Sequence, residues 1–330
     1  MIEQSVLEIL KIIVPQINAR LVIEPEYSKV GLIIFANGKK SCFKNTTFNI
    51  NPFASSEIAK DKNYTRFFLK YLGYNVPEER TFFSDKLNEK LDIKRDINDG
   101  FGYAEILGFP VILKPNNMSK GRMVTKVYNR DEYFEIASEI FRITDVMLVQ
   151  QYYSGNDFRI VVLNNKVFAA YKRKPLTIFG NDNSTINELL IEAEKELITK
   201  GRNIKIDHND KRLIQRLNRL GCSKSTVLGK DQEFQVFDNA NLSSGGSMYD
   251  FTSGIHNDFK ELAVKITNNM GLKFCGVDII TSDITKPLDE YIILEINASP
   301  GLNHFASLGT EQFELVKEIY LNILYSLQEE

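Results

Sequence analysis

Cysteine is scarce in this sequence: Cys42, Cys222 and Cys275 lie far apart and form no CxxC pair. Such spacing argues against a zinc site and against a disulfide framework. Scattered single thiols are typical of proteins in a reducing compartment, so we expect a cytoplasmic protein.

An excess of charge of one sign is also missing, because 41 basic residues face 43 acidic residues in a chain of 330. We therefore expect neither a nucleic acid nor a membrane as partner. No apolar run approaches the ~18 residues that cross a bilayer. The opening stretch MIEQSVLEILKIIVPQI has early acids and apolar residues at helical spacing, which predicts an amphipathic helix rather than a signal peptide.

The common phosphate-binding loops are absent as well. There is no GxxxxGKS/T segment, which excludes a Walker-type loop, and no GxGxxG segment, which leaves a dinucleotide fold unsupported. No internal repeat or low-complexity segment occurs. A nucleotide, if bound, must be held by another arrangement.

Two strand-like runs near the end of the chain carry acids where a simple buried strand would have none. Asp278 lies within 274–281, and Glu295 lies within 291–296, two positions before Asn297. Side chains two apart on a strand point to the same face. Antiparallel pairing of the two runs would therefore bring the three side chains together.

Three oxygen-bearing side chains, two of them ionised, suit Mg²⁺, with Mn²⁺ as a substitute. We predict Asp278, Glu295 and Asn297 as metal ligands, because buried carboxylates are costly unless they are paired or bound to metal. The alternative is that Asp278 pairs with a Lys or Arg and that Asn297 merely starts a turn. The Ser299-Pro300-Gly301 turn that follows favours the metal.

The segment FPVILKP predicts a compact apolar strand that ends at Lys114. A lysine buried at a strand end needs an anion, and Gly121 in the next loop lets backbone N–H groups approach phosphates. Lys62, Lys120 and Arg122 add further positive charge. We expect a phosphate site at Lys114.

Periodicity divides the rest of the chain into helices and strands. One helix is expected from Ser56 to Gly73, and another over 91–107. Strands at 157–164 and 166–175 should form a hairpin across Asn164-Asn165, and Thr185 with Glu188 fits a capping box. The mixture predicts an α/β (α+β) protein.

Six segments in one order resemble the ATP-grasp carboxylate–amine ligases, and the resemblance runs from about Gly31 to Phe305. The resemblance is closest to the ligase module of cyanophycin synthetases and of bifunctional glutathione synthetases. The segments are SEIAKDKNYTRFFLKYLGYNVP, GFPVILKP, VQQYYSGNDFRIVVLNNKVFAAYKRKP, NLSSGGSMYDFT, GVDII and LEINASPGLNHF.

The resemblance implies an ATP-grasp fold of three α/β subdomains, with ATP between two antiparallel sheets. We expect 1–60 to form a reduced N-terminal subdomain. Residues 61–160 should form the small lid subdomain with its lead-in helix, and 161–330 the catalytic subdomain.

The resemblance also implies roles for single residues at the nucleotide. The matched positions are Lys62 and Lys114 at the ATP phosphates, Gly121 in the phosphate loop, Gln150, Gln151, Tyr152 and Tyr153 in the linker that reads adenine, and Asp157 at the ribose hydroxyls. For the two glutamines we expect backbone rather than side-chain roles. Asp278, Glu295 and Asn297 match the magnesium ligands of the family.

At the reacting groups, Arg159 and Arg173 resemble arginines that hold the γ-phosphate, the acyl phosphate or the substrate carboxylate, for which the planar guanidinium is apt. For Arg173 the alternative is a surface cation in the run KRKP. Asn241, Gly245 and Gly246 match a loop that offers donors to the tetrahedral oxyanion. Ser299 and Gly301 are the expected substrate contacts.

The chain departs from the family pattern in two respects. Met118 and Met123 stand where relatives usually have glycine. The chain also lacks the Mur-ligase-like half of cyanophycin synthetases and the cysteine-ligating half of bifunctional glutathione synthetases. We therefore expect a stand-alone ligase.

The expected reaction has two steps: Mg-ATP phosphorylates a carboxylate, and an amine then displaces phosphate to give an amide. The expected partners are ATP, an acid and an amine that are amino acids or peptides, with a homodimer left open. One alternative is a ligase that modifies a ribosomal peptide. Another is a non-catalytic ATP-binding regulatory protein, against which the complete metal set argues.

Overall fold

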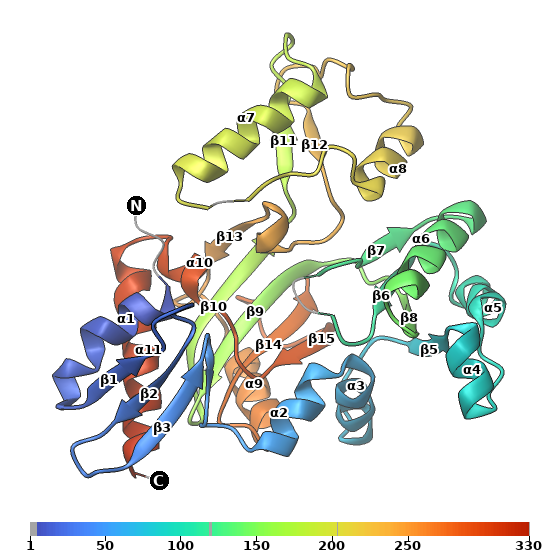
Figure 1. The fold of residues 1–330 in the computed structure, drawn as a ribbon. Coiled ribbons are helices and arrows are strands. Elements are labelled where there is room, and N and C mark those ends of the chain that lie inside the picture. Colours follow the sequence, from blue (N-terminus) through green and yellow to red (C-terminus); the bar gives the residue numbers. More distant parts are fainter. Residues whose placement is uncertain (1–4, 119–120, 203, 330) are drawn as a thin grey trace. The chain divides into compact units, whose positions relative to one another are not determined.

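The computed structural model describes residues 5–118, 121–202 and 204–329 (Figure 1). The chain forms two compact units, each assembled from separate segments. The first comprises Met1–Asn75, Asp157–Lys172 and Tyr249–Glu330, and the second comprises Val76–Asn156 and Arg173–Met248. Each unit combines segments that are far apart in the chain, so these units do not test the three consecutive subdomains expected from the sequence. Those subdomains stay a prediction.

The first unit begins with a small antiparallel sheet that packs on the last helix. Its order is β1-β2-β3-β4. Helix α11 buries Tyr320 among its apolar residues, and the rings of Phe48 and Tyr320 lie 5.7 Å apart. The bounds are α1 Val6–Ile13, η1 Pro15–Ile17, β1 Arg20–Ile23, β2 Val30–Ile34, β3 Lys40–Lys44, β4 Thr47–Phe48 and α11 Thr310–Glu329.

The central sheet has the order β13-β10-β9-β14-β15. Asn164 and Asn165 join β9 to β10 with φ angles of 47° and 65°, the left-handed conformations that a two-residue hairpin turn requires, so the predicted hairpin is confirmed. Helix α9 packs on β14, and α2 and α3 pack on β15. The bounds are α2 Phe53–Lys60, α3 Lys62–Tyr71, β9 Asn156–Leu163, β10 Lys166–Lys174, β13 Ser247–Asp250, α9 Asn257–Asn269, β14 Phe274–Thr281, β15 Tyr291–Asn297 and α10 Asn303–Ala306.

The second unit contains a four-stranded antiparallel sheet of order β5-β8-β6-β7. Helices α5 and α6 contact this sheet, and the core between them includes Phe101, Tyr133 and Leu113. The bounds are β5 Glu79–Phe83, α4 Asp85–Leu91, α5 Ile97–Leu107, β6 Val111–Pro115, β7 Thr125–Val127, α6 Arg130–Ile143 and β8 Val146–Gln151.

The later part of the second unit has its own small core, around Ile186, Leu190 and Leu213. Its helix α8 carries Arg219, whose Nη1 lies 3.0 Å from Oε1 of Glu132 on α6. The bounds are β11 Thr177–Phe179, α7 Ile186–Thr199, α8 Lys211–Arg219, β12 Glu233–Gln235 and η2 Leu242–Ser244.

Local signals placed some helix ends correctly and others not: the helix expected over 91–107 begins only at Ile97, where Asp96 caps α5. The capping box of Thr185 and Glu188 at the start of α7 is confirmed. The single helix expected from Ser56 to Gly73 is wrong, because Asp61 adopts an extended conformation and accepts a hydrogen bond from Tyr64 N at 2.9 Å. A cap of this kind starts a new helix, so two helices, α2 and α3, occupy the segment.

The strand pairings whose register is known are all antiparallel, and helices and strands alternate irregularly along the chain. The α+β class expected from the sequence is therefore confirmed. Within the described ranges, no helix combines the length and the apolar character needed to cross a membrane.

Candidate active site

Strands β14 and β15 bring the two predicted metal-binding acids face to face. Their antiparallel register pairs Asp278 with Glu295 and Gly276 with Asn297, as the two acid-bearing runs predict. The Asp278 side chain is 1% exposed, whereas that of Glu295 is 37% exposed. One carboxylate is therefore embedded in the sheet and the other borders solvent.

Arg159 on β9 is the direct partner of the buried acid. Its Nε lies 2.5 Å from Asp278 Oδ1 and its Nη2 lies 2.7 Å from Oδ2, a bidentate contact, while Glu295 Oε1 is 3.7 Å from Nη2. Burial alone would lower the pKa of Arg159, but the charges of Asp278 and Glu295 raise it well above its ordinary value. The guanidinium therefore stays charged.

Gly276 makes room for this arginine. A Cβ at Gly276 would lie 3.0 Å from Arg159 Cδ and 3.2 Å from Pro300 Cβ, closer than most real contacts. A side chain there would crowd the Arg159 side chain, which would have to shift by a few tenths of an ångström beside Asp278. Close packing against Arg159 and Pro300 therefore explains why glycine occupies position 276, which the sequence alone does not reveal.

The turn after β15 is held by the N-terminal part of the chain. Asn297 Oδ1 accepts a hydrogen bond from Ser299 N at 3.3 Å, so Asn297 does start a turn. Because Asp278 also pairs with Arg159, both contacts of the alternative reading of the sequence are present. Thr46 Oγ1 donates to Ser299 O at 3.1 Å, and Asn51 Nδ2 donates to Ala298 O at 2.8 Å. The backbone around Ser299 is therefore fixed, and open space surrounds the position of a Cβ on Gly301.

The chemistry of these donors fits a hard cation. Asp278, Glu295 and Asn297 offer oxygen atoms only, and a carboxylate can accept from Arg159 while keeping other lone pairs. The described residues contain no group of three or more His, Cys, Asp and Glu side chains that could hold a metal. The predicted metal ligands do not form such a group, because only Asp278 and Glu295 are acids and the third ligand, Asn297, is an amide.

The second group of predicted residues lies around Lys114, the next-to-last residue of β6 in the second unit. The Lys114 and Glu79 side chains are 7% and 2% exposed, and Lys114 Nζ lies 3.1 Å from Glu79 Oε2. Nζ also donates to Gln150 Oε1. The buried lysine expected from the sequence is confirmed, and β5 and β8 supply its partners through the register that pairs Glu79 with Gln150.

Glu79 was missed by the sequence reasoning, and so was the side-chain contact of Gln150 with Lys114. The expectation that Gln150 acts through its backbone does not describe its side chain, which is buried against Lys114. The segment PEERTFF predicts an extended stretch after a helix. Its local sequence pattern does not indicate a partner for Glu79. Only the pairing of β5 with β8 makes Glu79 a neighbour of Lys114.

The linker that follows β8 is ordered by its tyrosines. Gln151 N donates to Glu78 O at 2.9 Å, and Tyr153 donates its hydroxyl to Gln151 Oε1 at 2.9 Å. Lys126 Nζ lies 3.4 Å from the centre of the Tyr152 ring, and burial lowers the pKa of Lys126. The linker backbone is thus held in place.

Gly121 and Asn241, predicted separately, lie in contact in the second unit. Gly121 has a φ of +61°, and a Cβ there would lie 1.3 Å from Asn241 Nδ2. The N–H groups of Ser244 and Gly246 both donate to Asn241 O, and Gly245 N donates to Leu242 O. The donors predicted for an oxyanion are therefore engaged within their own loop in this structure.

The contacts described above do not include three further residues predicted for the site, Lys62, Asp157 and Arg173. Lys62 begins α3, Asp157 lies on β9 two positions before Arg159, and Arg173 lies near the end of β10. All three are half-buried. Lys120 lies outside the described residues.

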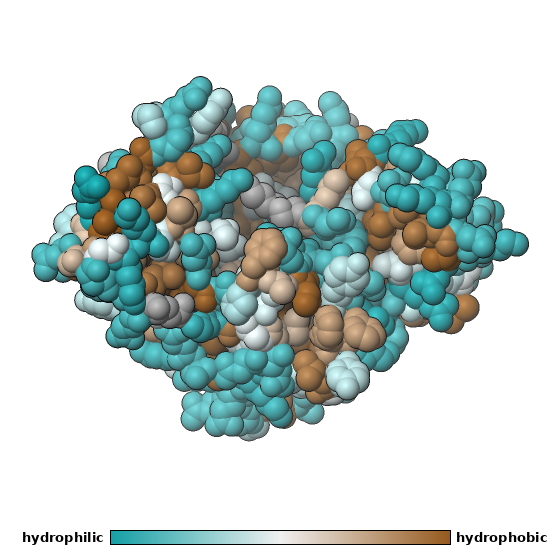
Figure 2. Space-filling model, turned by 60° about the horizontal axis from the view of Figure 1, so that its bottom comes forward, coloured by the Kyte–Doolittle hydropathy of each residue, from teal (hydrophilic) through white to brown (hydrophobic). Residues whose placement is uncertain are grey.

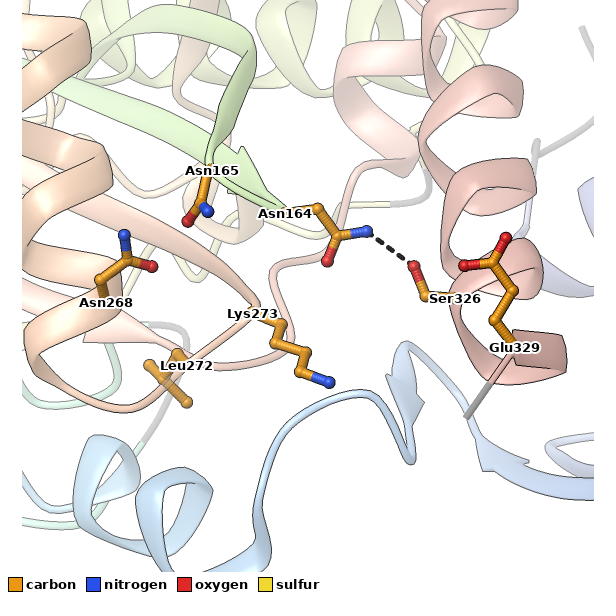
Figure 3. A pocket seen from close by; sticks show the side chains of 7 residues that line it. All are labelled: Asn164, Asn165, Asn268, Leu272, Lys273, Ser326 and Glu329. Atoms are coloured by element: carbon orange, nitrogen blue, oxygen red, sulfur yellow. Dashed lines mark hydrogen bonds between the residues drawn. The ribbon is translucent and has the colours of Figure 1, made fainter.

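A hollow of about 540 Å³ lies elsewhere in the first unit, at the β9–β10 turn and the ends of α9 and α11 (Figure 3). Asn164 Nδ2 donates to Ser326 Oγ across part of it at 2.6 Å. None of the residues predicted for the site lines it. The lining residues are Asn164, Asn165, Asn268, Leu272, Lys273, Ser326 and Glu329.

Comparison with known proteins gives a consistent result. The family described as RimK-like ATP-grasp domain matches residues 89–182 and 223–319. Cyanophycin synthetase of Crocosphaera subtropica is 31% identical over 272 residues, which are 78% of this chain and 29% of that protein. The glutathione biosynthesis bifunctional protein of Mannheimia succiniciproducens is 28% identical over 263 residues, 76% of this chain and 33% of that protein.

Solved structures show the same fold at low identity. A bifunctional glutathione synthetase from Pasteurella multocida has a TM-score of 0.59 and 24% identity, over 95% of this chain and 43% of that one. A D-alanine–D-alanine ligase from Bacillus anthracis has a TM-score of 0.52 and 16% identity, over 84% of this chain and 69% of that one. The chain spans about a third of the length of the curated relatives that it matches.

Proposed function

The chain belongs to the RimK-like ATP-grasp family, and on this premise we propose that it is an ATP- and Mg²⁺-dependent carboxylate–amine ligase. One observation carries the proposal. Asp278 and Glu295 lie opposite each other on adjacent strands with Arg159 beside both. A buried bidentate ion pair contributes little net stability, so an arrangement with a second acid next to it is better explained by binding of charged ligands.

The nucleotide in this proposal is ATP. Lys114 is a buried cation at a strand end, and Lys62 begins a helix that packs on the strand of Glu295. Both would contact phosphates. The backbone of Gln150, Gln151, Tyr152 and Tyr153 would read the adenine, and Asp157 would accept the ribose hydroxyls.

The metal ligands in this proposal are Asp278, Glu295 and Asn297, whose oxygen-only donor set fits Mg²⁺ or Mn²⁺. When bound, the ion would offset the negative charge of the ATP phosphates. Arg159 contacts both oxygens of Asp278 and so fixes the direction of its carboxylate.

The reaction in this proposal forms an amide through an acyl phosphate. The carboxylate oxygen of the acid attacks the γ-phosphorus and ADP leaves. The amine nitrogen then attacks the acyl carbon, phosphate leaves with the oxygen, and the amine loses a proton. Arg159 and Arg173 would hold the anionic groups, because phosphoryl transfer depends mainly on positioning and charge neutralisation.

Two further parts of the chain would contact the acyl group. The Asn241 side chain, with Gly245 and Gly246, would donate to the oxyanion once the loop releases its internal hydrogen bonds. The turn at Ser299 and Gly301, which its own hydrogen bonds hold in place, would form one wall of the substrate site. The acid and the amine are amino acids or peptides in this proposal; a homodimer and a cytoplasmic location stay predictions from the sequence.

The test is a screen for ADP release with amino acids and short peptides supplied in pairs, followed by mass detection of the product. We expect ADP and an amide mass with at least one pair, and neither in the presence of excess chelator. Tight ATP binding without ADP formation for any pair would instead favour the non-catalytic ATP-binding protein.

A further inference from the structure

Arg202, in the second unit, is a cation that the fold takes partly out of water without a carboxylate beside it. Figure 2 shows the usual place of polar residues, because on this face hydrophilic side chains project from the surface. Arg202 is instead half-buried, and its Nε is buried with no hydrogen-bond partner among the described residues. In that part of the chain its guanidinium makes one hydrogen bond, from Nη2 to Leu242 O at 2.5 Å.

The arginines of α8 show how a guanidinium is paired elsewhere in the same unit. Each of the three is mostly buried and has a carboxylate within 3.0 Å. The pairs are Arg212 with Asp210 at 2.5 Å, Arg216 with Asp238 at 2.9 Å and Arg219 with Glu132 at 3.0 Å. Within the described ranges Arg202 has no such pair.

Burial without a counter-charge is costly for this side chain. Burial lowers the pKa of Arg202, whereas at Arg159 the charges of the nearby acids outweigh the same effect. An arginine does not lose its proton in a protein, so the guanidinium stays charged and retains the cost of leaving water. An anion that binds from outside would offset this cost.

Two contacts place Arg202 beside the η2 loop, residues 241–246. Leu242 O accepts from Arg202 Nη2 and also from Gly245 N, at 3.2 Å. Arg202 N donates to Leu197 O at 2.9 Å, and Leu197 Cδ1 lies 3.3 Å from the position of a Cβ on Gly245. The cation therefore lies next to the loop that carries the donors proposed for the oxyanion.

The shared carbonyl links Arg202 to the release of these donors. A carbonyl oxygen can accept two hydrogen bonds, so Arg202 keeps Leu242 O bonded when Gly245 N turns to a substrate oxygen. The guanidinium also has further N–H groups, and its planar fork matches an oxyanion in pairs of hydrogen bonds. One side chain can thus support the loop and contact an anion.

We propose that Arg202 binds an oxyanion of the acid substrate beside the η2 loop, either its carboxylate or the phosphate that it carries after activation. This inference rests on the proposed function, because the acyl-transfer reaction is what brings such an anion to the loop. The substrate then supplies the counter-charge that the surrounding residues do not. The sequence alone gave Arg202 no role.

Urea unfolding of the full chain separates a binding role from a structural role. We expect Arg202→Met to keep or raise the unfolding midpoint, because it removes an unpaired charge and leaves Gly245 N on Leu242 O. Arg216→Met is the matched control and should lower the midpoint, because Asp238 loses its nearest cation. A midpoint that falls as far for Arg202→Met as for the control would make Arg202 a structural residue and end the inference.

The same assay with an added anion tests binding. The probes are inorganic phosphate and acetate, each compared with sodium chloride at equal ionic strength. Binding to the folded chain raises the midpoint, and we expect at least one probe to raise it more for the wild type and Arg216→Met than for Arg202→Met. An effect of phosphate alone assigns Arg202 to the activated acid, and an effect of acetate alone assigns it to the carboxylate. Equal rises with and without Arg202 would contradict the site.

Kinetics with an amino-acid pair that yields an amide test the role in the reaction. We expect Arg202→Met to lower kcat/KM for the acid about a hundredfold, as loss of an oxyanion donor does, with the KM for ATP nearly unchanged. Arg202→Lys should recover little, because a point charge does not reproduce the fork. An unchanged kcat/KM for the acid would overturn the inference. Failure of the proposed function is separate, because the wild type would then release no ADP with any pair while the anion effect at Arg202 persists.

Discussion

At the scale of the residue, the contact between Arg159 and Asp278 shows why one partner cannot be removed alone. Asp278 is almost fully buried, and both of its oxygens accept from the guanidinium. A buried carboxylate without its counter-ion retains the full cost of leaving water. The same contact gives the acid a fixed direction, which a ligand site requires.

We predict that Arg159→Ala lowers the free energy of unfolding by about 3–5 kcal/mol, because it leaves an unpaired buried charge. Arg159→Ala/Asp278→Asn should recover part of this loss, since neither charge then remains. Urea unfolding measures all three proteins. Lys166→Ala is the control, because the Lys166–Glu318 pair is exposed on both sides and should change stability by less than about 1 kcal/mol. A small effect of Arg159→Ala alone would contradict the burial of this pair.

Glu295 offers the complementary case, because its side chain is more exposed. We predict that Glu295→Ala abolishes ADP formation and leaves the urea midpoint nearly unchanged, since it removes a metal ligand without burying an unpaired charge. Glu290→Ala, an exposed acid in the turn before β15, should retain activity. Wild-type turnover by Glu295→Ala would end its assignment to the metal.

Lys114 and Glu79 separate stability from ligand binding. We predict that Lys114→Met weakens ATP binding strongly and also destabilises the fold, because Glu79 is left buried without its cation. Lys114→Met/Glu79→Gln should restore the unfolding midpoint but not the ATP affinity. Calorimetry with ATP and urea unfolding decide this, with exposed Lys90→Ala as control. ATP affinity that returns in the double variant would show that Lys114 acts only as a structural counter-ion.

At the scale of the element, the loop between β6 and β7 depends on its contact with the η2 loop. Gly121 adopts a positive φ and touches Asn241, so the two loops can lie this close only without a side chain at 121. The carbonyl of Gly121 also accepts from Asn239 Nδ2 at 3.4 Å. The predicted phosphate loop and the predicted oxyanion loop therefore share one local structure.

We predict that Gly121→Ala costs more stability than Gly73→Ala. Both glycines have a positive φ, which costs an alanine about 1–2 kcal/mol, but nothing lies within 4 Å of a Cβ at Gly73. Gly121→Ala/Asn241→Ala should recover the extra loss. Urea unfolding of the four proteins measures it, and equal losses for the two single variants would contradict the contact.

At the scale of the whole molecule, buried hydroxyl and thiol groups set the response to alkali. Burial raises the pKa of the Cys275 thiol to about 12, from an ordinary value of 9.0. It also raises the pKa values of Tyr133 and Tyr320. Each group is neutral in the fold and ionises at lower pH after unfolding, so in alkali the unfolded state binds fewer protons.

We predict that the free energy of unfolding is insensitive to these groups below pH 9 and falls as the pH rises towards 12. Urea midpoints across this range measure the decline. Cys275→Ala should make it shallower, whereas Cys42→Ala should not, because Cys42 is exposed. A rise in stability across the same range would contradict the burial of these groups.

Local patterns alone determined much of this protein. The hairpin at Asn164-Asn165, the capping box at Thr185, the strand that ends at Lys114 and the two acid-bearing strands all follow from turn chemistry, capping and alternation over a few neighbouring residues. The order of six short segments also indicated the ATP-grasp family. The turn, capping and alternation signals act within a few neighbouring residues, and the order of segments is a property of the chain itself, so the sequence displays both directly.

Only the tertiary structure decided which charges meet and which faces are buried. Arg159 and Asp278 are 119 residues apart, and Glu79 reaches Lys114 only because β5 and β6 both pair with β8. The helical spacing of the aromatic residues in α3 marks one face of that helix but does not show that this face lies outside. Such outcomes depend on long-range pairing and on the cost of burying charge, because a side chain's surroundings are supplied by distant segments that a local pattern does not contain.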